Sequence, residues 1–259
     1  MKISDAAART TRKILEPLKA PLRKLLGRPQ PPKVKPKHDF DVKYGVDTSG
    51  LIDARDLHSG HQNDQFITAY FGVPPSRLAN AFELWQRTTT EKPASQYRFI
   101  DVGCGKGRAV LLASQFEFRD VFGIELQPKL AEIASENVRG YREQNSVPMD
   151  ISILCGDGPS LLPELLAGPV LIYLYNPFQA PVLRTLLESI INQSEKLSGP
   201  IDVLYLYPEY EKVFSEFPLF QKICHEEIGI SEEDQDDGLS GPLDPCSLYR
   251  LEPQRQTSP

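Results

Sequence analysis

The chain has 259 residues, of which 40% are hydrophobic and 25% charged, a composition typical of a globular domain with a full core. No apolar run approaches the ~20 residues that cross a bilayer, so no transmembrane segment is expected. The four cysteines form no Cys-x-x-Cys pair. This pattern favours a reducing, cytoplasmic location and argues against structural zinc or another metal site.

Charge is divided unevenly along the chain, whose net charge is −6. Residues 1–37 hold eleven Lys and Arg residues against two acidic ones, a net charge of +9, which leaves −15 for the remainder. Leucines at helical spacing alternate with the basic residues, but Pro17 and Pro21 interrupt the helix, and a proline-rich linker follows. Two roles stay open for this basic N-terminal arm. It contacts an anionic membrane or nucleic acid peripherally, or it is a tail that is solvated or docked on its own domain.

Residues 38–95 are expected to form a leading helical or cap segment. The motif YGVDTSG, residues 44–50, opens a polar and turn-rich stretch that indicates the cover of a surface or a cleft. Farther on, Leu78, Phe82 and Trp85 share one face of a helix that begins at a proline and a serine.

Residues 96–253 alternate strand and helix signals. Five short apolar runs predict buried strands: residues 97–102 (YRFIDV), 121–126 (VFGIEL), 151–155 (ISILC), 170–175 (VLIYLY) and 201–207 (IDVLYLY). Helical periodicity between the runs predicts a doubly wound parallel sheet with right-handed crossovers. Residues 220–228 and 246–252 flank an acidic loop with no helix between them, which predicts an antiparallel hairpin at one edge. The expected fold class is α/β, with a mostly parallel seven-stranded sheet.

The segment FIDVGCGKGR, residues 99–108, joins the first of these strands to a helix. Gly103, Gly105 and Gly107 stand at the carboxyl end of the strand, where open parallel sheets bind ligands. Glycine permits positive φ and lets a ligand approach the main chain closely. Asp101 lies just ahead of the glycines, and a carboxylate suits an ammonium or sulfonium group better than a pyrophosphate.

The pattern D-x-G-x-G-x-G resembles motif I of the class I S-adenosylmethionine-dependent methyltransferases, and GIEL at the next strand end is similar to their motif II. The resemblance covers roughly residue 96 to the C-terminus, and residues 44–85 are similar to the leading part of a bacterial group of unassigned substrate. It implies S-adenosyl-L-methionine as cofactor, with the three glycines close to its methionyl and ribose portions. Asp101 would lie near the amino group, Glu125 would accept hydrogen bonds from both ribose hydroxyls, and Asp157 would face the adenine amino group.

Asn176, Pro177 and Phe178 follow the fourth predicted strand. They resemble the Asn/Asp-Pro-Pro-Tyr/Phe signature of methyltransferases acting on planar amines, with the second proline missing. The resemblance implies that Asn176 and the next carbonyl accept hydrogen bonds from the nucleophilic nitrogen, and that the aromatic ring packs on the substrate. A plain turn before the next helix is an equally open interpretation.

The acidic loop of the hairpin, residues 231–245, is expected on the ligand side of the sheet if the sixth strand runs parallel to the others. Its carboxylates would favour a cationic acceptor, although a plain acidic insertion is the alternative.

The prediction is therefore an enzyme, an S-adenosylmethionine-dependent methyltransferase whose unidentified acceptor is preferably an amine nitrogen on a protein or small molecule. Two alternatives stay open. A nicotinamide-dependent oxidoreductase shares the strand, glycine loop, helix and acid, but its Gly-x-Gly-x-x-Gly fingerprint needs a glycine where this chain has Arg108. The other alternative is a catalytically inactive interaction module with a methyltransferase fold.

Overall fold

The computed structural model describes residues 37–89, 92–145, 147, 149–234 and 241–253. The predicted basic arm, residues 1–37, lies outside this part of the chain except for Lys37, as do Asp236 and Asp237 of the acidic loop. Among the helices of the described residues, none has both the length and the apolar character needed to cross a membrane.

The described α-helices are α2 (Asp39–Tyr44), α3 (Pro75–Thr88), α4 (Arg108–Ala113), α5 (Pro128–Gln144), α6 (Gly158–Leu161) and α7 (Ala180–Ile191). Short 3₁₀ helices connect the larger elements: η1 (Ala54–Asp56), η2 (Gln62–Phe66), η3 (Ala94–Gln96), η4 (Leu162–Leu165), η5 (Ser194–Lys196) and η6 (Glu211–Glu216). The strands are β1 (Leu51–Ile52), β2 (Tyr70–Phe71), β3 (Arg98–Val102), β4 (Asp120–Glu125), β5 (Ile151–Cys155), β6 (Val170–Tyr175), β7 (Ile201–Leu206), β8 (Gln221–Gly229) and β9 (Leu243–Leu251). Proline occupies the first turn of α3, α5 and α7, where its missing N–H costs nothing.

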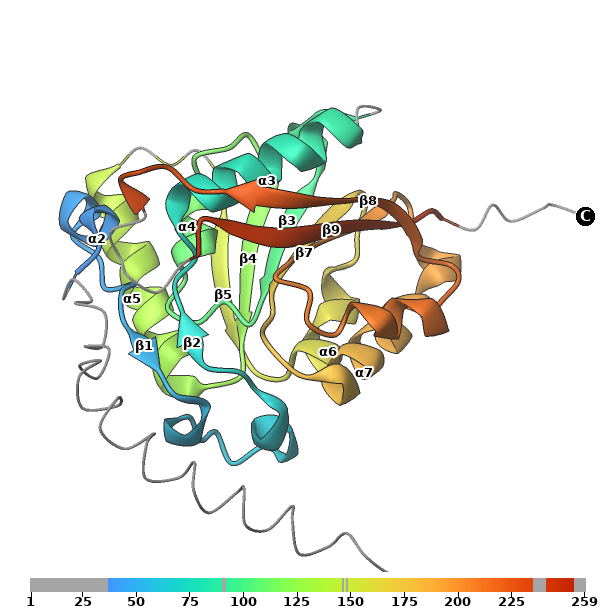
Figure 1. Ribbon diagram of the computed structural model, residues 1–259, viewed down its shortest axis with the longest axis horizontal. Coiled ribbons are helices and arrows are strands. Elements are labelled where there is room, and N and C mark those ends of the chain that lie inside the picture. The colour runs from blue at the N-terminus through green and yellow to red at the C-terminus, as the bar shows by residue number, and fades with distance from the viewer. Residues whose placement is uncertain (1–36, 90–91, 146, 148, 235–240, 254–259) are drawn as a thin grey trace, which may run out of the picture. The chain divides into compact units, whose positions relative to one another are not determined.

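One sheet holds β3 to β9 in the order β5-β4-β3-β6-β7-β9-β8 (Figure 1). Strands β3 to β7 pair in parallel, and β9 runs antiparallel between β7 and β8. The predicted α/β fold, a mostly parallel seven-stranded sheet with an antiparallel edge hairpin, is confirmed. The strand order reverses between β3 and β6, and open α/β sheets bind ligands beyond the carboxyl ends of the strands at such a switch point.

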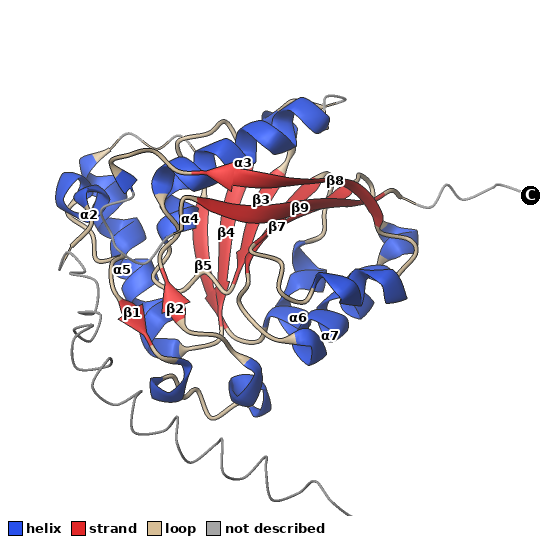
Figure 2. Ribbon diagram, in the orientation of Figure 1, coloured by secondary structure: helices blue, strands red, loops and turns tan. Residues whose placement is uncertain are grey.

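Helices cover both faces of the sheet (Figure 2). On one face, Phe82 and Trp85 of α3 are buried in a cluster with Phe99 of β3, and the Phe82 and Phe99 rings meet edge to face at 5.4 Å. On the other face, Leu183 and Leu186 of α7 belong to the cluster that buries the opposite side of the strands. Because both faces are covered, the parallel strands are short, mostly apolar runs rather than alternating ones, whereas the edge strand β8 is largely exposed.

The leading segment packs directly on the sheet. Helix α3 contacts β7 and β8, and its Trp85 Nε1 donates to Oδ2 of Asp202 on β7 at 2.8 Å. Arg77, at the start of α3, pairs with Asp244 on β9. Between β1 and α3 the chain, residues 57–73, runs past the carboxyl ends of the strands, and we call this stretch the strap. An antiparallel bridge joins Ile67 of the strap to Phe178, which follows β6.

Candidate functional site

A cavity lies under the strap, at the carboxyl ends of β3, β4, β5 and β6. The space between its walls, with the solvent at its open mouth included, is about 920 Å³. The residues predicted from the sequence that line it are Asp101, Gly103, Gly105, Glu125, Asp157, Pro177 and Phe178. Residues far apart in the sequence therefore meet in one cavity at the switch point of the sheet.

The main chain holds the carboxylate of Glu125 at the end of β4. Its Oε2 accepts a hydrogen bond from the Gly105 N–H at 2.7 Å, and its Oε1 accepts one from the Gln127 N–H at 2.8 Å. Burial raises the pKa of Glu125, while these backbone N–H groups act in the opposite direction. Each oxygen keeps a further lone pair, so the fixed carboxylate can accept from two neighbouring hydroxyl groups.

Asp101, at the end of β3, is only 3% exposed, and no donor among the described residues bonds its carboxylate. Burial raises its pKa well above the usual range, and the negative charge of Glu125 raises it further. Two buried acids thus share a cavity without a cation between them. A ligand that carries a positive charge would favour the ionised form of Asp101 and lower its pKa again.

The cation in the described part of the lining, Arg108, is already paired. Its Nε donates to Oγ1 of Thr48 at 2.7 Å, one Nη donates to the Gly72 carbonyl at 3.2 Å, and the other donates to Oγ of Ser49 at 3.2 Å. The carboxylate of Asp41 lies 3.8 Å from the guanidinium. Arg108 therefore holds the leading segment and is not free to neutralise the acids.

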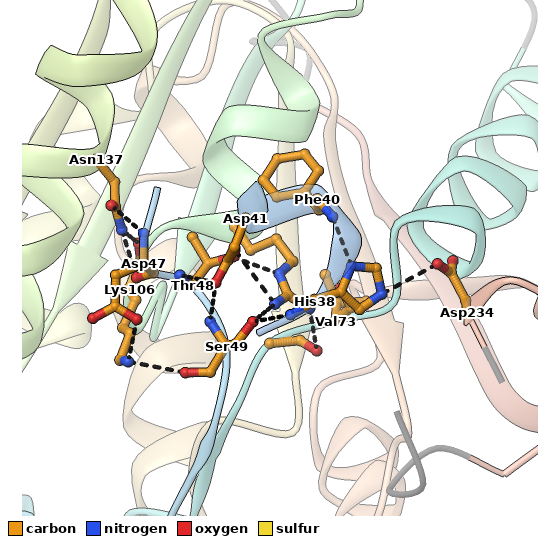
Figure 3. A network of polar contacts seen from close by, with 12 residues as sticks. His38, Phe40, Asp41, Asp47, Thr48, Ser49, Val73, Lys106, Asn137 and Asp234 are labelled. Carbon is orange, nitrogen blue, oxygen red and sulfur yellow. Dashed lines mark hydrogen bonds and ion pairs between the residues drawn. The ribbon is translucent and has the colours of Figure 1, made fainter. Parts of the chain in front are cut away.

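Figure 3 shows the polar network around Asp41, Thr48 and Ser49, the residues that contact this arginine. Asp41 of α2 accepts hydrogen bonds from the N–H groups of Thr48 and Ser49, both at 2.8 Å, and from the Thr48 hydroxyl. On the other side, Lys106 Nζ lies 2.9 Å from Oδ1 of Asp47. The motif YGVDTSG, residues 44–50, thus binds the two basic residues that flank Gly107, a role that the sequence did not indicate.

Two glycines of the loop are required by their own backbone and by neighbouring side chains. Gly103 and Gly105 have φ values of +81° and +54°, which L-residues rarely adopt. A Cβ at Gly103 would lie 2.4 Å from Cβ of Pro177, and one at Gly105 would lie 2.2 Å from Cε2 of Tyr70. The sequence predicted that a ligand approaches the Cα atoms of these glycines. In the structure Pro177, in the loop after β6, and Tyr70, in the strap, occupy the space where a Cβ would stand, while both glycines still line the cavity.

Two predicted site residues are not in the lining. Gly107, at φ +85°, is the N-cap residue that precedes α4, and a Cβ there would lie 3.2 Å from Cβ of Ala134 on α5. Asn176, at φ +43°, donates through Nδ2 to Oε2 of Glu209 at 3.0 Å and accepts at Oδ1 from the Tyr205 hydroxyl at 3.3 Å. In this arrangement its side-chain amide is directed to Tyr205 on β7 and to Glu209 shortly after that strand.

The strap is bonded to the strand ends that it covers. Asn63 donates through Nδ2 to Oδ1 of Asp157 at 2.7 Å, so the carboxylate expected to face an adenine already has a partner. Gln127, two residues after the end of β4, donates through Nε2 to Oδ1 of Asp64 at 2.9 Å. The hydroxyl of Tyr70 donates to the Thr48 carbonyl at 2.7 Å. These contacts make the strap one wall of the cavity.

Antiparallel β9, inserted beside β7, separates this sheet from dinucleotide-binding sheets. The sheet is the mostly parallel seven-stranded sheet with an antiparallel edge hairpin that the resemblance to class I methyltransferases implies. No protein-family model matches the sequence, and no curated protein matches it.

Solved structures similar to the chain include a SAM-dependent methyltransferase from Anabaena variabilis (14% identity, 70% of this chain, 87% of that chain, TM-score 0.45). A ribosomal protein L11 methylase from Lactobacillus delbrueckii subsp. bulgaricus is 17% identical over 68% of this chain and 79% of that chain, with a TM-score of 0.42. A precorrin 8W decarboxylase from Methanobacterium thermoautotrophicum is 17% identical over 65% and 87%, with a TM-score of 0.42. At these low identities and TM-scores the similarities carry no argument about function, which has to be argued from the site.

Proposed function

We propose that the protein is an S-adenosyl-L-methionine-dependent methyltransferase whose cofactor binds in the cavity under the strap. One observation carries the proposal: Asp101 and Glu125, two buried carboxylates at neighbouring strand ends, line one cavity whose described cation is already paired. The cofactor carries an ammonium and a sulfonium group, a pair of ribose hydroxyls and no phosphate. A site lined by two buried carboxylates therefore favours this positively charged, phosphate-free ligand over an anionic one.

When bound, the cofactor supplies a methyl group on a positively charged sulfur, a good leaving group for an in-line displacement. The residues of this chain then act by binding and alignment. Asp101 receives the ammonium group and Glu125 accepts from the ribose hydroxyls. The strap excludes water, and Pro177 and Phe178 form the wall beside the glycine loop. Holding two reactants in line contributes up to about 7–11 kcal/mol to the lowering of the barrier.

The glycine loop argues against the nicotinamide alternative. A pyrophosphate needs free backbone N–H groups at the start of the helix. Here the N–H groups of Gly103 and Cys104 both donate to the Ile124 carbonyl, at 2.8 and 3.0 Å, and that of Gly105 donates to a carboxylate. With Arg108 also paired, this turn offers a pyrophosphate little to bind.

For the acceptor we propose an amine nitrogen, on a protein or a small molecule. Pro177 and Phe178 of the signature line the cavity. The carboxylates in the same lining favour an acceptor molecule that carries positive charge, while its reacting nitrogen attacks as the neutral amine, because an ammonium nitrogen has no lone pair. The role implied for Asn176 requires its amide to exchange Glu209 and Tyr205 for the acceptor. The basic arm, with its contact to an anionic membrane or nucleic acid, and the cytoplasmic location stay predictions.

Calorimetric titration with adenosylmethionine and with NAD tests the proposal. Wild-type protein should bind adenosylmethionine, and Glu125→Ala should lose at least tenfold in affinity because two charge-assisted hydrogen bonds are removed. Glu132→Ala, at an exposed position of α5, is the matched control. Binding of NAD without adenosylmethionine, or an unchanged affinity in Glu125→Ala, would overturn the assignment.

Radiolabelled methyl transfer to a cell extract, separated by molecular size, then addresses the acceptor. Label in an amine of a protein or metabolite supports the acceptor class. Cofactor binding without transfer to any component would favour the inactive interaction module instead.

A further inference from the structure

The cavity contains a buried hydroxyl group without a partner. Tyr173, on β6, is 1% exposed, and its Oη makes no hydrogen bond within the described part of the chain. The residue lines the cavity and is the register partner of Asp101 on the adjacent strand β3. Burial raises the pKa of Tyr173, and the nearby Asp101 carboxylate raises it further, so the hydroxyl keeps its proton. An unpaired buried hydroxyl is costly and needs an explanation.

No other side-chain donor described in the lining is in this position. Each of the others with an N–H or O–H group already has a partner: Asn63, Thr68, Tyr70, Arg108, Gln127 and Tyr175. Beside the unbonded carboxylate of Asp101 the cavity therefore presents one uncommitted hydroxyl donor.

We propose that the Tyr173 hydroxyl binds the α-carboxylate of adenosylmethionine while Asp101 binds the α-ammonium group on the same carbon. The inference rests on the proposed function and adds a binding residue to it. An α-amino acid carries opposite charges on neighbouring atoms and needs an acceptor and a donor side by side. Asp101 and Tyr173 can form such a pair: they are register partners on adjacent parallel strands, whose backbones lie about 4.8 Å apart, both line the cavity, and the Asp101 charge acts on the Tyr173 hydroxyl. Arg108, the cation of the lining that would otherwise bind a carboxylate, is held by the leading segment.

The competing explanation is a water molecule shared with α3. Arg77 Nε is the other unpartnered buried side-chain atom among the described residues, and the charge of Arg77 acts on Tyr173. If a water joins these two groups, the hydroxyl serves the fold and not a ligand. The two explanations predict opposite effects of removing the hydroxyl.

The test is calorimetric titration of wild type and Tyr173→Phe with three ligands. Adenosylmethionine carries both charged groups, decarboxylated adenosylmethionine carries the ammonium alone, and methylthioadenosine carries neither. Tyr173→Phe should weaken the first about 10- to 100-fold, the range for a hydrogen bond to a charged group, and should change the other two less than twofold. Asp101→Asn should weaken the first two ligands and spare the third. Tyr249→Phe, whose hydroxyl bonds Glu211 outside the cavity, should change none.

Urea unfolding of the ligand-free variants is the second readout. Tyr173→Phe should be at least as stable as wild type, because it removes an unpaired hydroxyl. Equal weakening of all three ligands, or a loss of stability with unchanged ligand affinities, overturns the role of Tyr173. If wild type binds none of the three adenosyl compounds, the proposed function itself fails, and Tyr173 loses its role with it.

Discussion

The contact between Tyr70 and Gly105 allows a test of how the strap supports the glycine loop. Gly105→Ala places a methyl group 2.2 and 2.3 Å from Cε2 and Cδ2 of the Tyr70 ring, where carbon atoms need about 3.5 Å. The ring has to move by more than an ångström, and its hydroxyl then leaves the Thr48 carbonyl. Gly60→Ala is the matched control, because Gly60 also has a positive φ, +85°, and a Cβ there meets nothing within 4 Å.

The two variants should differ by the cost of moving Tyr70. A left-handed backbone costs an L-residue about 1–2 kcal/mol, and both variants share this cost. Gly105→Ala also leaves a buried hydroxyl and a carbonyl unpaired, which adds about 1–3 kcal/mol. Its free energy of unfolding should therefore fall by about 2–5 kcal/mol, against about 1–2 kcal/mol for Gly60→Ala.

Urea unfolding measures both losses, provided that the dependence of the free energy on urea concentration stays constant. In a Tyr70→Ala background the clash is absent, so Gly105→Ala should then cost no more than the backbone component. Equal losses for Gly105→Ala and Gly60→Ala in the wild-type background would refute the reasoning. So would an excess loss that persists after the ring has been removed.

Further predictions concern the buried charges. Because Asp101 has a raised pKa in the free protein and a bound cation lowers it, adenosylmethionine affinity should increase with pH until Asp101 is ionised; calorimetry across pH should show this slope, and Asp101→Asn should remove it. The folded protein also binds this proton more tightly than the unfolded chain does, so the stability that it contributes is lost as pH rises through the raised pKa. Ligand-free Asp101→Asn should therefore be at least as stable as wild type at neutral pH in urea unfolding, and a clear loss would contradict the assignment. Asp202→Ala should cost about 3–5 kcal/mol of unfolding free energy, because it leaves Arg250 largely buried without its carboxylate, whereas Glu216→Ala, from an exposed ion pair, should stay near wild type.

The sheet and the acid pair followed from the sequence for a simple physical reason. Strands that are buried on both faces are mostly apolar along their length. The apolar runs that lead to Asp101 and Glu125 therefore predicted parallel strands. The carboxyl ends of parallel strands share one edge, and the structure brings both acids into one cavity there. Local rules were sufficient for these features.

Other parts of the site depend on contacts that no local pattern contains. Tyr173 lies inside an apolar run and looks like core, and only the packing around it shows that its hydroxyl is unpaired. The motif at residues 44–50 binds Lys106 and Arg108, about 60 residues away, so its role has no local signal. Helix α4 ends at Ala113, and the Phe116 ring beyond it packs edge to face on Phe82 of α3 at 4.7 Å, a contact that no local pattern indicates.

The strap has contacts on both sides of the place where transfer would occur. Tyr70 rests on the glycine loop, and Ile67 bridges to Phe178 on the acceptor side. If the cofactor and the acceptor bind as proposed, a shift of this single segment would change the affinity of the protein for both ligands. Thermodynamic reciprocity then requires each ligand to alter the dissociation constant of the other by the same factor. Cofactor and acceptor would therefore bind cooperatively and not independently.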